Sequence, residues 1–248
     1  MTSDIIALVP ARAGSKRLKN KNIKLLNGHP LIAYTIRIAK KSKIFKKIFC
    51  ITDSKKYQKI AKLYGADEIG LRPKNTSLDY SPDIEWLNWA INKVENENFK
   101  FKYFAILRPT NPFRTTSMIK NAYKKFLKNK NADSIRAVEL TKIHPGKIWS
   151  KKKNYIFPIL KKYKQGIPWH SMQYASLPQY YSQNASLEIS SLRSLKKNKS
   201  ISGKKIIPYV TKNFEGFDIN SSLDFELAKI VFRQIRKKKI YDIDTDLY

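Results

Sequence analysis

Apolar runs alternate with segments of helical period through the first 140 residues, and this alternation limits the possible folds strongly. Runs with the length of buried strands cover residues 5–9, 47–52, 66–71, 103–107 and 133–140. Segments with apolar residues at helical spacing lie between them, at residues 31–41, 55–64, 83–94 and 115–127. Strands and helices in this order form largely parallel sheets with helices on both faces. We therefore expect an α/β fold.

The alternation stops near residue 143. From there to about residue 181 the chain is rich in Pro, Tyr, Trp, Lys and Gln, without a clean period. So many aromatic residues argue against a disordered linker. Strand-like runs return at residues 185–190 and 205–210, followed by a helical segment at 223–235. We expect one domain, formed by residues 1–142 and 182–248, with an inserted lobe of hairpins at 143–181 that is not an independent domain.

The net charge of +31 raises the question of nucleic-acid binding. Most of the 50 basic residues are lysines, spread along the whole chain, whereas sequence-specific readers rely on arginine. We expect no specific nucleic-acid partner, although a basic surface attracts anionic nucleotides and acidic sugars. No apolar run is long enough to span a membrane, and the N-terminus lacks signal-peptide features, which predicts a cytoplasmic protein without a membrane partner.

The chain has one cysteine, Cys50, so an intrachain disulfide is excluded. It lies inside the apolar run at residues 47–52. Free cysteine in such a run usually behaves as a small buried hydrophobe, and we expect that role here.

A short basic loop follows the first apolar run, at residues 10–22. It combines small residues with cations, namely Arg12, Gly14, Ser15, Lys16, Lys19 and Lys21. Backbone N–H groups at small residues can approach phosphates closely, and the cations neutralise their charge. The Walker A pattern is absent. A triphosphate loop and a solvated basic loop both remain open on composition alone.

Eight segments, in order along nearly the whole chain, resemble the acylneuraminate cytidylyltransferases. This family includes the CMP-sialic acid synthetases and their legionaminic and pseudaminic acid relatives. The segments are PARAGSKRLKNKN from Pro10, NGHPLIAYTI from Asn27, ITDS from Ile51, LRP from Leu71, LRPTNPFR from Leu107, HPGKIW from His144, LPQYYSQNASLEI from Leu177 and FDINSSLDFELA from Phe217.

The resemblance implies a Rossmann-like, three-layer nucleotidyltransferase fold with a small lobe used for dimerisation. It implies that CTP is coupled to the anomeric hydroxyl of a nonulosonic (sialic-acid-like) sugar acid, with release of pyrophosphate. Mg²⁺ or Mn²⁺ is the expected cofactor, and a homodimer the expected assembly. Two alternatives stay open: another sugar nucleotidyltransferase, for Kdo or a hexosamine, and a non-catalytic nucleotide- or RNA-binding relative.

The resemblance also assigns nucleotide-binding residues. They are Ala11, Arg12, Gly14, Ser15, Lys21, Asn22, Arg72 and Arg108, and Arg12 and Lys21 join Asp218 as catalytic candidates. At Arg108 the family usually has a glutamine that contacts the nucleotide. Arginine cannot accept a hydrogen bond but can pair with a carboxylate or a phosphate, so the role of this position is open.

The metal candidates are Asp218 and Asn220, which match a family pair of aspartates that hold magnesium. Alternate residues of an extended segment point to the same side, so both can face a triphosphate. An amide oxygen is a weaker magnesium ligand than a carboxylate. We expect Asp224 to cap or support the following helix, and the similar DIDTD at residues 242–246 to be a solvated tail.

The sugar-binding candidates lie in or beside the inserted lobe. By resemblance they are Lys147, Gln173, Tyr180, Gln183 and Asn184. A lysine at this place suits the carboxylate of a sugar acid. His144, three residues before that lysine, is expected to be a structural turn residue rather than a base.

Overall fold

The computed structural model describes residues 4–238 and divides the chain into two compact units. The larger unit comprises the chain up to residue 137 and from residue 184 onward, and the smaller unit comprises residues 138–183. The sequence placed the inserted lobe at residues 143–181. The acidic segment at 242–246 lies outside the described residues.

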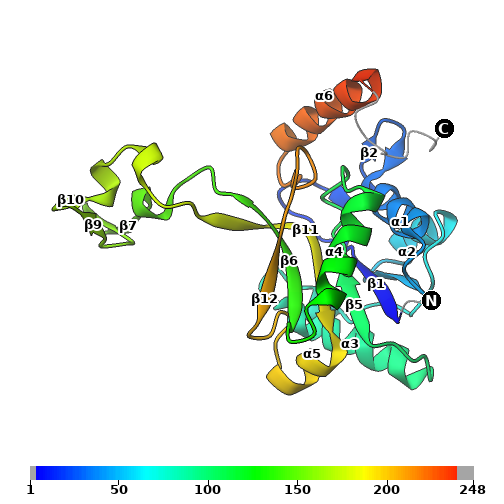
Figure 1. Ribbon diagram of the computed structural model, residues 1–248. Helices are drawn as coiled ribbons and strands as arrows, with labels where there is room; N and C mark the ends of the chain where they lie inside the picture. Colours follow the sequence, from blue (N-terminus) through cyan, green and yellow to red (C-terminus); the bar gives the residue numbers. More distant parts are fainter. Residues whose placement is uncertain (1–3, 239–248) are drawn as a thin grey trace. The chain divides into compact units, whose positions relative to one another are not determined.

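A six-stranded sheet forms the centre of the larger unit (Figure 1). Its strands, in spatial order, are β12 (Ile206–Val210), β6 (Ser134–Leu140), β11 (Tyr181–Ser191), β5 (Tyr103–Ile106), β1 (Ile5–Pro10) and β4 (Ile48–Ile51). Strand β1 pairs in parallel with both β4 and β5, whereas β11 is antiparallel to β5. The carboxyl ends of β1, β4 and β5 therefore meet at one edge of the sheet.

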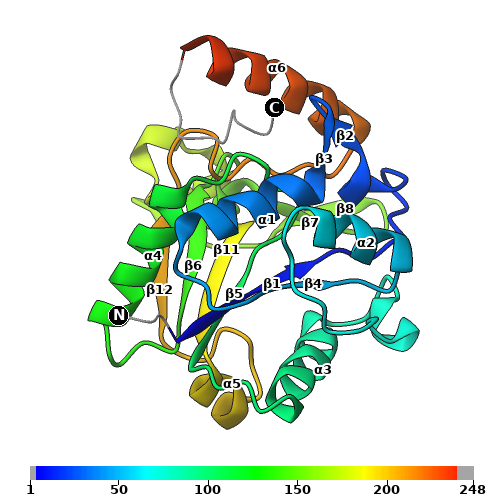
Figure 2. The same cartoon turned by 90° about the vertical axis from the view of Figure 1, so that its right-hand side faces the viewer.

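Helices cover both faces of this sheet (Figure 2). On one face pack α1 (Leu31–Ser42), α2 (Lys55–Leu63) and α4 (Thr116–Lys128), and on the other α3 (Asp83–Asn96) and α5 (Leu192–Asn198). Strand β1 shows why, because its side chains alternate: Ile5, Ala7 and Val9 enter one core, and Ile6 and Leu8 enter the other. The expected three-layer α/β fold is confirmed.

A third apolar cluster attaches α6 (Ser222–Lys238) to the body of the larger unit. Phe225 and Phe232 of α6 lie in one cluster with Leu26 and Leu31. Leu26 belongs to a small hairpin of β2 (Leu25–Leu26) and β3 (His29–Pro30), which turns through Asn27 and Gly28. Both turn residues have positive φ, 47° and 86°, as a tight Asn-Gly hairpin turn requires.

One local expectation from the sequence was wrong, and one short helix was not predicted. Residues 66–71 form no strand, because only an isolated bridge joins Asp67 to Phe49. The Asp67 carboxylate instead accepts hydrogen bonds from the backbone N–H of Ile48 and from Lys47, both 2.8 Å long, beside the edge strand β4. The short helix α5 was not expected; the Ser191 hydroxyl caps it by accepting from the N–H of Ser194.

The smaller unit consists of hairpins and single helical turns. The hairpins pair β7 (Trp149–Lys152) with β8 (Tyr155–Pro158), and β9 (Tyr163–Lys164) with β10 (Ile167–Pro168). The turns are η3 (Pro145–Lys147), η4 (Trp169–Ser171) and η5 (Tyr174–Ser176).

His144 lies at the centre of this unit and is buried. Its Nδ1 accepts from the N–H of Gly146 at 2.9 Å, and its Nε2 lies 3.0 Å from the carbonyl oxygen of Pro178. Three aromatic rings meet its ring edge-on, those of Trp169, Tyr174 and Tyr180. These contacts match the structural role expected for His144.

Two further expectations from the sequence concern Cys50 and membrane-spanning segments. Cys50 is buried in β4, and burial raises the pKa of its thiol to about 12, so it is not a reactive thiolate. Among residues 4–238, no helix is long and apolar enough to cross a membrane.

Arg114 is more deeply buried than Arg72, with 1% of its surface exposed. It donates to the carbonyl oxygens of Ser186 (2.6 Å) and Arg108 (3.1 Å) and to the hydroxyl of Thr35 (3.2 Å). Burial lowers its pKa to about 9. One guanidinium thereby links β11, α1 and the loop after β5.

We predict that Arg114→Lys lowers the free energy of unfolding by about 2–4 kcal/mol. A single ammonium cannot reach all three acceptors, and buried acceptors without partners are costly. Urea unfolding followed by circular dichroism measures the loss. Arg193→Lys, at an exposed position of α5, is the matched control and should change stability by less than about 0.5 kcal/mol. Equal effects in the two variants would contradict a linking role for Arg114.

Candidate active site

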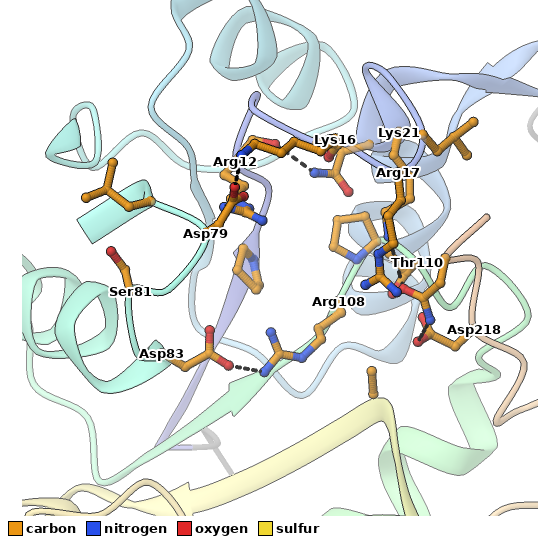
Figure 3. A pocket seen from close by; sticks show the side chains of 18 of the residues that line it. Arg12, Lys16, Arg17, Lys21, Asp79, Ser81, Asp83, Arg108, Thr110 and Asp218 are labelled. Atoms are coloured by element: carbon orange, nitrogen blue, oxygen red, sulfur yellow. Dashed lines mark hydrogen bonds and ion pairs between the residues drawn. The ribbon is translucent and has the colours of Figure 1, made fainter. Parts of the chain in front are cut away.

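A polar cavity of about 300 Å³ opens where the carboxyl ends of β1 and β5 meet (Figure 3). Ligands of open α/β sheets bind at this edge, outside the carboxyl ends of the strands. Six cations line it, namely Arg12, Lys16, Arg17, Lys21, Arg72 and Arg108. Three carboxylates do so as well, those of Asp79, Asp83 and Asp218. All these residues belong to the larger unit, and the cations favour an anionic ligand.

The loop after β1 is held in place by two hydrogen bonds. The N–H of Ala13 donates to Asp53 at 2.8 Å, and the buried amide of Asn22 donates to the carbonyl oxygen of Arg12 at 3.1 Å. Asn22 lies in the helical turn η1 (Lys21–Ile23), which closes the loop. The backbone beside the cavity is thereby fixed, and the Arg12 side chain projects from a held position.

The side chain of Lys21 contacts the segment that carries the metal candidates Asp218 and Asn220. Its Nζ donates to the carbonyl oxygen of Ile219 at 2.9 Å and to Oδ1 of Asn220 at 3.3 Å. Burial lowers the pKa of this ammonium, and the charge of Asp218 offsets part of that effect. A half-buried ammonium in this position can donate to an anionic ligand in the cavity.

Asp218 and Asn220 face the cavity together, with the buried Ile219 between them pointing the other way. This matches the alternation expected of an extended segment. The Asn220 amide donates to Oδ2 of Asp218 at 2.6 Å, whereas Oδ1 of Asp218 is buried and has no hydrogen-bond partner. A buried carboxylate oxygen without a partner is unfavourable unless a cation or a donor reaches it.

Asp224 supports the start of α6. Its Oδ2 accepts from the N–H groups of Asn220 (2.9 Å) and Ser221 (2.7 Å) and from the Ser221 hydroxyl (2.8 Å). The Ser221 hydroxyl in turn accepts from the N–H of Asp224, which completes a capping box. The carboxylate is engaged in capping, as the sequence suggested, and it does not line the cavity.

Arg72 is buried at the wall of the cavity. Its guanidinium donates to the hydroxyl and carbonyl oxygen of Thr76, in the turn η2 (Lys74–Ser77), and lies 5.7 Å from the ring centre of Trp86. Burial lowers its pKa, and the charge of Asp83 opposes this. These contacts fix Arg72 as part of the cavity wall.

Arg108 belongs to a chain of charges in which Glu188 is buried and the other members are partly exposed. It pairs with Asp83 at 2.6 Å and lies 3.6 Å from Glu188, which also pairs with Arg136. Burial would raise the pKa of Asp83, but Arg108 and the Trp86 indole N–H lower it overall. The sequence left either a carboxylate or a phosphate as the partner of Arg108, and in the structure its partners are carboxylates. The guanidinium still lines the cavity, with much of its charge balanced by the protein.

The structure brings together most of the candidates for nucleotide binding but not all. Arg12, Ser15, Lys21, Asn22, Arg72 and Arg108 line the cavity. Ala11 and Gly14 do not line it. Ala11 is buried in the core, because it continues the alternation of β1 and its N–H donates to Ile51.

The sugar-binding candidates are divided between the two units. Lys147 donates to the carbonyl oxygens of His170 (3.1 Å) and Met172 (2.6 Å) within the smaller unit. The other candidates of this unit are Gln173 before η5, Tyr180 beside His144 and the exposed Gln183. In the larger unit, the side-chain amide of Asn184 donates a hydrogen bond to the hydroxyl of Thr211 at 3.0 Å.

Sequence reasoning identified Asp218 but missed the other acidic residues of the cavity. Asp79 and Asp83 line it, and Glu188 forms its buried support, yet none was a candidate. A signal did exist for Asp83, because it stands in the first turn of a predicted helix and follows Arg72, a candidate for nucleotide binding, by eleven residues (83 − 72). Asp79 lies in a loop without a pattern, and only the fold reveals its partners.

Fold and cavity together define an α/β nucleotide-binding protein of the nucleotidyltransferase type. The family model described as "Cytidylyltransferase" matches residues 6–246. The chain belongs to this cytidylyltransferase family.

Similar proteins include several bacterial proteins. The N-acylneuraminate cytidylyltransferase of Escherichia coli O18:K1:H7 is 31% identical over the whole chain, which spans 55% of that relative's length. The post-translational flagellin modification protein B of Campylobacter coli is 31% identical over 94% of this chain and 96% of its own. The CMP-N,N'-diacetyllegionaminic acid synthase of Legionella pneumophila is 30% identical over 91% of this chain and 94% of its own.

A solved structure of CMP:2-keto-3-deoxy-manno-octonic acid synthetase with CTP has a similar fold. Its TM-score is 0.66, at 13% identity, over 94% of this chain and 99% of that one. At this identity the similarity concerns the fold alone.

We predict that Arg108 and Asp83 are energetically coupled. Arg108→Gln and Asp83→Asn should each destabilise the protein, and the double variant should lose less than their sum by about 0.5–1 kcal/mol, because solvent screens a pair in which the Asp83 side chain is 42% exposed. The pKa of Asp83 is lowered in the folded protein, so its contribution is complete above the ordinary carboxylate pKa of about 4 and is lost as the pH falls through the folded value. Urea unfolding at pH 7 and near pH 3 measures the cycle. A coupling independent of pH would contradict an ion pair.

Proposed function

We propose that this protein transfers CMP from CTP to a nonulosonic sugar acid and releases pyrophosphate. The observation that carries the proposal is the cavity at the carboxyl edge of the sheet, where six cations meet three carboxylates. The named relatives act on N-acylneuraminic and diacetyllegionaminic acids, which supports a sugar acid of this class.

The chemistry requires two anions to be held together while a hydroxyl oxygen attacks the α-phosphorus. Charge must be neutralised where it develops, on the phosphate oxygens and on the leaving pyrophosphate. Arg12 and Lys21 suit this role, because one projects from the fixed loop after β1 and the other stands half-buried beside Asp218. In the proposal these two cations bind the triphosphate, with Arg72 and Arg108 forming the wall of the cavity.

The donor set beside Lys21 fits a divalent cation. Asp218 presents a buried carboxylate oxygen without a partner, and the neighbouring Asn220 supplies an amide. Among the described residues no cluster of three His, Cys, Asp or Glu side chains exists that would hold a metal by itself. In the proposal Asp218 holds Mg²⁺ or Mn²⁺ jointly with the nucleotide's phosphates, and the metal supplies Lewis-acid charge neutralisation.

The smaller unit is proposed to mediate dimerisation and to contribute to sugar binding. Its β7–β8 hairpin leaves large apolar side chains exposed, including Tyr155 (72%), Ile156 (59%) and Phe157 (46%). Exposed apolar surface of this kind is typical of protein interfaces. Lys147, Gln173, Tyr180 and Gln183 in this unit, and Asn184 next to it, are the proposed contacts of the sugar acid.

Pyrophosphate release over a panel of nucleotides and sugar acids tests the reaction. We expect release with CTP together with sialic, legionaminic or pseudaminic acid, at a rate at least about tenfold above that with ATP, GTP or UTP. Kdo and hexosamine phosphates serve as the competing acceptors. Release that depends on one of these instead, or no release with any pair, would overturn the proposal.

Magnesium titration at fixed CTP tests the metal site. We expect Asp218→Asn to reduce the rate at least about a hundredfold at all magnesium concentrations, because it removes the carboxylate of the pair. Asn220→Asp should lower the magnesium concentration needed for half-maximal rate by adding a second carboxylate. Normal magnesium dependence in Asp218→Asn would place the metal elsewhere.

Light scattering at micromolar concentration measures the assembly. We expect twice the mass of one chain, and we expect the double substitution Ile156→Lys with Phe157→Lys on β8 to give a single-chain mass, since it places charge on exposed apolar surface. Substitution of the exposed Leu63 by Lys in α2 is the control and should leave the mass unchanged. A single-chain mass for the unaltered protein would exclude the homodimer.

A further inference from the structure

Asp79 forms ion pairs with two cations of the cavity, Arg12 and Lys16. Its Oδ1 lies 3.0 Å from Nη1 of Arg12, and its Oδ2 lies 2.5 Å from Nζ of Lys16. The same Arg12 nitrogen also donates to the carbonyl oxygen of Ser77 at 3.2 Å. Figure 3 shows Asp79 directly beside Arg12, on the far side of the cavity from Asp218. One carboxylate thus bridges two cations of the loop after β1.

A carboxylate and a phosphate are alternative partners for these cations. Both present oxygen anions, and guanidinium and ammonium groups bind either one. A triphosphate bound to Arg12 and Lys16 would place its negative charge against that of Asp79. Because like charges repel at contact distance, the carboxylate and the triphosphate cannot both occupy this position.

The loop that carries Asp79 has few apolar anchors. On either side of Asp79, Leu78 is 64% exposed and Tyr80 is 97% exposed. The loop is held to η2 by polar contacts, such as the Ser81 hydroxyl to the carbonyl oxygen of Asn75. Asp83 differs, because its carboxylate accepts hydrogen bonds from the Trp86 indole N–H and from Arg108. Asp79 can therefore leave the cations at a small cost, whereas Asp83 cannot.

We propose that Asp79 is an internal competitor of the nucleotide's triphosphate for Arg12 and Lys16. This inference rests on the proposed function, since it concerns the triphosphate of CTP. Asp79 holds the two cations in the empty cavity and is displaced when the triphosphate enters. Its presence lowers the affinity for every ligand that needs these cations, and it discriminates against weaker anions that cannot displace it.

Binding measured by calorimetry without divalent metal tests this, with tripolyphosphate, CTP and CMP as probes. We expect Asp79→Asn to lower the Kd for tripolyphosphate and CTP by about fivefold, since it removes two partly exposed ion pairs that are each worth little. The Kd for CMP should change less than about twofold, because a monophosphate requires fewer of these cations. Asp79→Glu keeps the charge and should bind like the unaltered protein.

The matched control is Glu68→Gln, which also removes one negative charge and breaks an exposed pair, the 2.9 Å contact with Lys62. It lies outside the cavity lining and should leave all three Kd values within about twofold. Equal tightening in this control would mean a general charge effect and would overturn the proposal. Unchanged or weaker tripolyphosphate binding in Asp79→Asn would overturn it as well.

Two further outcomes separate this inference from the proposed function. If Asp79→Asn weakens CTP binding only when magnesium is added, Asp79 is a metal ligand and the competition is refuted. If the unaltered protein prefers another nucleotide to CTP, the proposed reaction fails, while tripolyphosphate still tests the competition directly.

Discussion

The parallel pairing of β1 with both β4 and β5 is the constraint on which the rest of the larger unit depends. It brings the carboxyl ends of three strands to one edge, so the loops that follow them face one another. Strand β11 runs antiparallel to β5, and this direction brings Ala185, near its start, to the same edge. The apolar alternation of β1 makes this arrangement stable, because each face of the sheet then has its own core.

The cavity shows how a strongly basic chain handles its charge. Most cations of the cavity have partners within the protein: Lys21 donates to a backbone carbonyl oxygen, Arg72 donates to Thr76, and Arg108 lies between two carboxylates. Such partners orient the side chains and reduce the cost of burying them. In contrast, the buried Oδ1 of Asp218 has no hydrogen-bond partner, and for this reason the metal proposal centres on that residue.

Several parts of this arrangement could be read from the sequence. Periodicity predicted every α-helix except the short α5, and most strands of the central sheet, because burial on two faces imposes a repeat on the sequence. The alternation of Asp218, Ile219 and Asn220 was predictable for the same reason, and the capping role of Asp224 follows from its spacing to Ser221. These features depend on neighbours within a few residues. The absence of a strand at 66–71 was not predictable, because it depends on the hydrogen bonds that the Asp67 carboxylate accepts from Lys47 and Ile48.

The sequence by itself determined the layered α/β fold, the basic loop after the first strand and the family resemblance. Only the tertiary structure decided the partners of the charges. Arg108 could have paired with a phosphate or a carboxylate, and the fold placed it against Asp83 and Glu188, which are 25 and 80 residues away (108 − 83 and 188 − 108). Asp79 likewise meets Arg12 across 67 residues (79 − 12). Pairing of charges over such separations depends on which loops the sheet brings to one edge, and local pattern carries no record of that choice.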